Sequence, residues 1–265
     1  MGARKMIFRI CSAVFILVFA LAQAPFRSAH AAGTLFVKPD GTGDCSGWAN
    51  ACGLQSALTT AMSGDEIWAA AGIYKPTTNG ADRAATFQLI DGVALYGGFA
   101  GTESERADRD PAANATTLSG DIDNNDLQKP ILTDPSTETG NMSNSLHVVT
   151  GATSQTGTTL LDGFTITAGY AGSSGTGGGM FNGPTSSPTL SNITFIGNVA
   201  GFGGAMYLWS NSPVLTNVTF SNNAASTYGG GLEIDGGVPS LTNVTFSGNS
   251  AGSSGGGIFS AGTPT

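Results

Sequence analysis

The feature that most constrains this chain is a 26-residue repeat in its second half. A glycine run followed by one apolar residue recurs at this period without drift. The four copies are Gly177–Met180, Gly203–Met206, Gly229–Leu232 and Gly255–Ile258. Between them the chain repeats Leu-[Ser/Thr]-Asn-[Ile/Val]-Thr-Phe, with the Phe at Phe195, Phe220 and Phe246 and an Asn three residues later at Asn198, Asn223 and Asn249. A fixed period of this length indicates a repeat architecture.

Short alternating segments inside each repeat predict strands rather than helices. Ile193-Thr-Phe195 and Met206-Tyr-Leu208 place apolar residues at every second position, which is the period of a strand. A propeller blade needs roughly 40 residues, so each unit fits one coil of a parallel β-helix better. The 40 glycines follow no Gly-X-Y period, which excludes collagen.

Stacked coils would bring equivalent residues into columns about 4.8 Å apart. The repeat then places Phe220 between Phe195 and Phe246, and stacks the Asn side chains in hydrogen-bonded ladders at the corners. Glycines allow the sharp turns before the next strand. Identical charges stacked at this spacing would repel one another, and no Lys or Arg follows Lys129. We therefore predict an all-β chain, a single-stranded right-handed parallel β-helix, with the hand taken from the usual crossover rule.

The segment before the repeat is expected to begin the same solenoid. Leu54, Ala57, Leu58 and Ala61 have helical spacing and predict a short helix capping the first coil. We expect an N-terminal cap over 32–65, irregular coils with long loops over 66–160, and regular coils over 161–265. The sequence stops within a repeat, so we expect it to be truncated relative to a longer protein.

Residues 1–31 resemble a signal peptide. Arg4, Lys5 and Arg9 precede the apolar run 10–22, and Ala29-His-Ala31 fits a cleavage site. The alternative, a membrane anchor, would need roughly 20 apolar residues. Removing this segment leaves six basic and 18 acidic residues, a net charge of −12. An acidic mature chain argues against nucleic acid and anionic membranes as partners.

Cleavage would leave two cysteines, Cys45 and Cys52. Outside the cytosol such a pair predicts a disulfide that fastens the N-terminal cap. Two free thiols are the alternative. A metal site would need further ligands, and the only histidine left, His147, is distant in sequence.

Three stretches of the early coils, Gly64–Thr77, Tyr96–Glu103 and Leu118–Ile122, are similar to the opening coils of secreted bacterial right-handed β-helix proteins. The later Phe-x-x-Asn and Gly-Gly-[Ala/Gly]-[Met/Leu/Ile] pairs resemble the repeats of polymorphic outer-membrane proteins, within the pectin-lyase-like fold group. This resemblance covers most of residues 34–265 and implies a secreted or cell-surface, adhesin-like role. Because the fold also hosts enzymes, it does not specify function.

Two carboxylates in the repeat are the candidate ligand-binding residues. Glu233 and Asp235 project from one face of a predicted strand, with Tyr207 and Trp209 on the coil before and Phe259 on the coil after. Acids among aromatics could bind a carbohydrate or, less readily, hydrolyse a glycoside. The alternative is an ordinary outward-facing strand. A lyase base of the Arg or Lys type is excluded from the repeat coils, and we assign no catalytic residue.

A cluster of acidic residues precedes the repeat. Asp121, Asp123 and Asp126 resemble the start of an EF-hand loop, but Asp126 and Leu132 stand where that loop requires Gly and Glu. A solvated acidic loop is the favoured interpretation, and a bound calcium ion the alternative.

These observations predict a non-catalytic protein, secreted or at the cell surface (the outer membrane included), that displays a surface for adhesion or structure. Its expected partner is an extracellular glycan or a host or matrix surface, and no membrane span is expected after signal removal. A carbohydrate-active protein, binding a polysaccharide or acting as a lyase or hydrolase, is the alternative.

Overall fold

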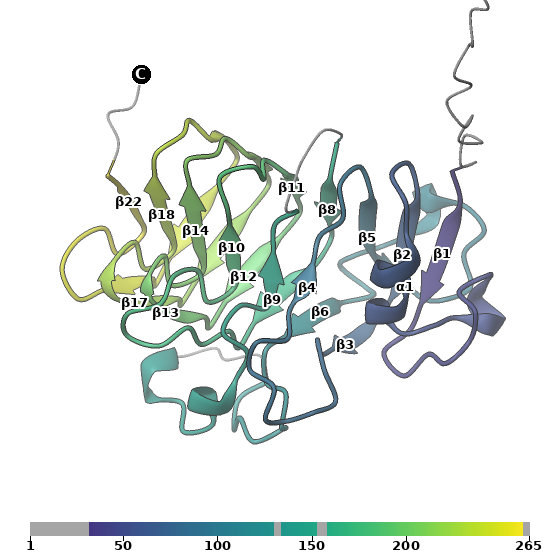
Figure 1. Cartoon of the computed structure of the whole chain (residues 1–265), viewed down its shortest axis with the longest axis horizontal. Coiled ribbons are helices and arrows are strands. Elements are labelled where there is room, and N and C mark those ends of the chain that lie inside the picture. Colours follow the sequence, from purple (N-terminus) through teal and green to yellow (C-terminus); the bar gives the residue numbers. More distant parts are fainter. Residues whose placement is uncertain (1–31, 130–133, 153–157, 262–265) are drawn as a thin grey trace, which may run out of the picture. The chain divides into compact units, whose positions relative to one another are not determined.

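The computed structural model describes residues 32–129, 134–152 and 158–261. These residues form an all-β parallel β-solenoid of about seven turns, and every strand pair in it is parallel (Figure 1). The predicted all-β parallel β-helix is confirmed. The predicted signal peptide lies outside the described residues.

Three long sheets and one short sheet form the walls of the solenoid. Sheet 1 consists of β1 (Thr34–Val37), β2 (Glu66–Ala70), β5 (Ala94–Phe99), β8 (Leu160–Asp162), β11 (Thr189–Ser191), β15 (Val214–Thr216) and β19 (Ser240–Thr242). Sheet 2 consists of β3 (Gly72–Tyr74), β6 (Thr116–Ser119), β9 (Thr165–Thr167), β12 (Thr194–Ile196), β16 (Thr219–Ser221) and β20 (Thr245–Ser247). Sheet 3 consists of β4 (Phe87–Gln88), β7 (Val149–Thr150), β10 (Met180–Asn182), β14 (Met206–Trp209), β18 (Leu232–Asp235) and β22 (Ile258–Ser260). Sheet 4 consists of β13 (Val199–Phe202), β17 (Ala224–Tyr228) and β21 (Ser250–Ala251).

Equivalent residues of successive repeats lie directly over one another. Phe195 pairs with Phe220, and Phe220 with Phe246. The ring centroids of these pairs are 5.0 and 4.9 Å apart and the rings are nearly parallel. The 26-residue period is therefore one turn of the solenoid, as the repeat predicts.

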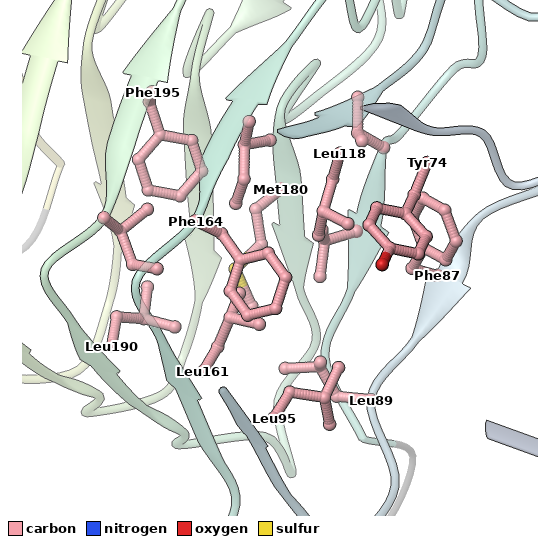
Figure 2. Packing of buried hydrophobic residues seen from close by; sticks show 14 of the residues in the cluster. Tyr74, Phe87, Leu89, Leu95, Leu118, Leu161, Phe164, Met180, Leu190 and Phe195 are labelled. Carbon is pink, nitrogen blue, oxygen red and sulfur yellow. The ribbon is translucent and has the colours of Figure 1, made fainter. Parts of the chain in front are cut away.

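The core is a column of apolar side chains enclosed by the three long sheets. Leu161 and Leu190 come from sheet 1, Phe195 from sheet 2 and Met180 from sheet 3, and each has no exposed surface. Figure 2 shows these side chains converging in one interior. At about 25 cal/mol per Å² of buried apolar surface, this column is the main stabilising term of a fold whose strands are only two to six residues long.

An asparagine ladder follows the core at one corner. Asn198 Nδ2 donates to Asn223 Oδ1 at 3.0 Å, and Asn223 Nδ2 donates to Asn249 Oδ1 at 2.9 Å. A second, exposed ladder joins Asn192, Asn217 and Asn243, all three with φ between 53° and 56°. Asn tolerates this left-handed conformation better than most residues, so the repeated Asn serves both the turn and the ladder.

The N-terminal coil carries the predicted cap. The helix α1 (Leu54–Thr60) buries Leu54, Ala57 and Leu58 and packs against β1 and β4. The disulfide between Cys45 and Cys52 is confirmed, and both residues are buried. Single-turn 3-10 helices occur at Trp48–Asn50, Arg106–Asp108, Pro135–Thr137 and Asn141–Ser143. Within the described ranges no helix has the length and apolar character needed to span a bilayer.

Candidate functional site

The five predicted carbohydrate-binding residues meet on the outer face of sheet 3. Strand alternation in β14 turns Met206 and Leu208 into the core and leaves Tyr207 and Trp209 outside. The register places Tyr207 beside Glu233, Glu233 beside Phe259, and Trp209 beside Asp235. Residues 26 positions apart thus become neighbours on one surface, which we call the sheet 3 face.

Tyr207 and Asp235 are joined across adjacent coils. The Tyr207 hydroxyl donates to Asp235 Oδ2 at 2.6 Å. Burial, followed by this hydrogen bond, raises the pKa of Tyr207 well above its ordinary value. Phe181 of the preceding coil stacks on Tyr207 with ring centroids 6.0 Å apart. Trp209 is 49% exposed beside this fixed pair, so the face offers a flat indole next to an oriented carboxylate.

Glu233 is enclosed although its strand position faces outward. Its side chain is only 5% exposed, and Oε2 is buried without a hydrogen-bond partner. Tyr228 and Phe259 stack nearby with ring centroids 4.4 Å apart. Burial, and then the charge of Asp235, raises the pKa of Glu233 to about 7. Glu233 therefore changes charge near neutral pH.

A raised pKa such as that of Glu233 is what the general acid of a glycosidase requires. The two carboxylates differ in their access to a ligand, however, because Asp235 is partly exposed and Glu233 is buried. A substrate could reach Asp235 and Trp209, but not Glu233 Oε2, in this conformation. The geometry suits binding better than acid–base catalysis.

A groove of about 520 Å³, which the sequence does not predict, lies on the outer side of sheet 2. It is lined by β3, β6 and β9 and by the loop that follows β6. Lys75 Nζ donates to Asp121 O and to Asn124 Oδ1, and Lys129 Nζ donates to Asp121 Oδ2 at 3.0 Å and to Asn124 O. Burial lowers the pKa of Lys75 below its ordinary value. Lys75 lies 46 residues before Asp121 in the chain, so the sequence does not predict this contact.

The three acidic residues considered for calcium have different partners. Asp121 is buried and engages the two lysines. Asp123 is exposed and accepts from Asn125 Nδ2 at 2.8 Å, whereas Asp126 is buried and accepts from Asn144 Nδ2 at 2.9 Å. Among the residues that the structure describes, no group of three or more His, Cys, Asp or Glu is placed to hold a metal ion.

No model of a protein family, no curated protein and no solved structure matches this chain. Its function must be inferred from the fold and its surfaces.

Proposed function

We propose that this chain is a non-catalytic, exported β-solenoid that presents the sheet 3 face to an extracellular glycan. It would act as an adhesin-like or structural display protein, secreted or at the cell surface. In this proposal the solenoid is right-handed and belongs to the pectin-lyase-like group with polymorphic outer-membrane-type repeats, in line with the motif resemblance. The observation that carries the binding role is the half-exposed Trp209 indole next to the Tyr207–Asp235 hydrogen bond.

A sugar ring combines apolar C–H faces with hydroxyl groups at its rim. A flat aromatic ring covers the first, and an oriented carboxylate accepts from the second. On the sheet 3 face these groups project from paired strands of adjacent coils. Because the strands fix the positions of both groups, little conformational freedom is lost when a ligand binds.

The charge of the face indicates which glycans fit. Glu233 and Asp235 lie there, and the sequence holds no Lys or Arg after Lys129. Uronate or sulfate groups would meet repulsion without a compensating cation. Neutral or amino sugars are therefore the expected ligands.

Glycoside hydrolysis is the second candidate function. The pKa of Glu233 is raised to about 7 next to Asp235. A carboxyl group with such a raised pKa holds its proton as a general acid requires. It would need a movement that opens Glu233, which is enclosed here.

A glycan array with the mature chain tests the binding role. We expect a neutral or amino-sugar ligand whose affinity falls at least tenfold in Trp209→Ala. Met62→Ala removes a comparably exposed apolar side chain beyond α1 and should bind as the wild type does. A blank array, or equal loss in both variants, would refute the proposal.

Incubating each array ligand with the protein and analysing it for cleavage separates the two functions. Uncleaved ligand supports display. Cleavage that disappears in Glu233→Gln and Asp235→Asn would make the protein a hydrolase and overturn the non-catalytic assignment.

A further inference from the structure

Four buried oxygen atoms lack hydrogen-bond partners in one region of the fold. They are Asp126 Oδ1, Asn144 Oδ1, Ser145 Oγ and Thr167 Oγ1. None of these residues is more than 4% exposed. Elsewhere in the described ranges, only three buried side-chain atoms share this condition. Buried polar atoms almost always have hydrogen-bond partners. Four unpartnered atoms in one region therefore indicate that a ligand binds between them.

Backbone and side-chain hydrogen bonds hold these residues around Gly120. Ser145 N donates to Gly120 O, and Gly120 N donates to Thr167 O, both at 2.9 Å. Asn144 Nδ2 donates to Asp126 Oδ2 at 2.9 Å. Asp126 and Thr167 both line the sheet 2 groove. Because Asn144 contacts Asp126, and Ser145 and Thr167 both contact Gly120, the four residues belong to one region next to that groove.

The chemistry of these atoms favours a cation over another protein group. Carboxylate and amide oxygens only accept hydrogen bonds, and hydroxyl oxygens also carry lone pairs. Carboxylate, amide carbonyl and hydroxyl oxygens, completed by waters, are ligands that Ca²⁺ takes in sets of six to eight. No nitrogen or sulfur atom is among the four. The donor set is that of a hard divalent cation.

The charges around Asp126 are mixed. Burial, together with the charges of Asp121 and Glu138, raises the pKa of Asp126 to about 6, whereas the hydrogen bond from Asn144 and the charge of Lys129 act in the opposite direction. Lys75 and Lys129 engage Asp121, and Arg83 Nε donates to Asn144 O at 2.7 Å. Because the two lysines contact Asp121, they do not pair with Asp126. Asp126 Oδ2 accepts from the Asn144 side-chain amide, and Asp126 Oδ1 has no hydrogen-bond partner.

We propose that Asp126, Asn144 and Ser145 bind one hard divalent cation, with Ca²⁺ as the probe, next to the sheet 2 groove. Thr167 lies at its edge. The cation would tie the loop 121–129 and the segment 141–145 to β9. This site shares only Asp126 with the Asp121–Asp123–Asp126 set that the sequence indicated, and it is independent of glycan binding on the sheet 3 face.

Calorimetric titration of the mature chain with Ca²⁺, after chelator treatment, tests the site. We expect one ion per chain and a higher melting temperature with Ca²⁺ than with chelator. Asp126→Asn should weaken binding at least tenfold. Asp123→Asn is the matched control, because Asp123 is exposed and contacts Asn125, and it should bind as the wild type does.

Asn144→Asp is a second variant that tests the site if Asp126→Asn does not fold. It places a second carboxylate against Asp126, so its melting temperature should fall in chelator and recover with Ca²⁺. A wild-type chain that binds no Ca²⁺ at millimolar concentration would overturn the proposal, and buried water would then fill the site. Equal loss in Asp123→Asn and Asp126→Asn would overturn the residue assignment.

Discussion

At the scale of single residues, burial decides what Glu233 can do. A strand position that alternation turns outward would ordinarily leave a carboxylate in water. Here the stacked rings of Tyr228 and Phe259 lie nearby, and only 5% of Glu233 is exposed. The carboxyl group loses hydration without gaining a partner for Oε2. Its charged form is therefore disfavoured, and its pKa rises to about 7.

The raised pKa of Glu233 makes the stability of the folded protein depend on pH in a defined direction. Because the folded pKa of about 7 lies above the ordinary 4.5, the folded state holds the proton more tightly. The contribution of Glu233 to stability is full below pH 4.5 and is lost as pH rises through 7. Glu233→Gln should remove this loss, leaving the variant about 1–2 kcal/mol more stable than the wild type at pH 8.

Urea unfolding of both proteins at pH 5 and pH 8 measures this difference. The comparison must be made as variant minus wild type, because Asp126 also has a raised pKa, of about 6, in both chains. A stability difference that does not change between the two pH values would contradict the assignment.

At the scale of elements, asparagine ladders connect the turns of successive coils. Asn223 lies between β16 and β17. It donates to Phe195 O and to Asn249 Oδ1, and accepts from the backbone and side chain of Asn198. One side chain thus satisfies buried groups of three successive coils.

We expect Asn223→Ala to lower the free energy of unfolding by roughly 3 kcal/mol, because it leaves several buried groups unpaired. Asn217→Gly is the matched control. It removes the exposed ladder while keeping a residue suited to φ 56°, and should change stability by less than about 1 kcal/mol. Denaturant unfolding followed by circular dichroism compares them. Equal losses would show that the buried ladder has no special role.

At the scale of the whole molecule, each coil contacts its neighbours and little else. Stability in such a solenoid is a sum of local terms, so a constraint at one end acts mainly there. The Cys45–Cys52 bridge closes a short loop, with a sequence separation of 7, next to α1 and β1. It fastens the first coil without touching the regular repeats.

Reduction of this bridge should therefore destabilise the N-terminal coil by about 2 kcal/mol. Hydrogen exchange should show lost protection in β1 and β2, with β14 and β18 unchanged. A chain carrying Cys45→Ser and Cys52→Ser should behave like the reduced protein. Uniform loss of protection along the chain would instead indicate that the solenoid unfolds as a single unit.

The regular part of the fold follows from the sequence because its contacts repeat. One period of 26 residues fixes which residues are neighbours, so the stacked Phe195, Phe220 and Phe246 and the meeting of Tyr207, Glu233 and Asp235 can be read from spacing. The helix α1 follows from the local spacing of its apolar residues, and the disulfide from a close cysteine pair in a chain expected to be exported. These contacts need no knowledge of the path of the chain beyond one coil.

What the sequence could not decide depends on the irregular coils and on burial. The sheet 2 groove brings Lys75 against Asp121, residues from loops of unequal length that no period relates. The enclosure of Glu233, and the different partners of Asp121, Asp123 and Asp126, depend on how neighbouring side chains and loops fold over them. Periodicity determines which residues are adjacent along the solenoid, whereas the exclusion of water and the partner of each charge arise only in the tertiary structure.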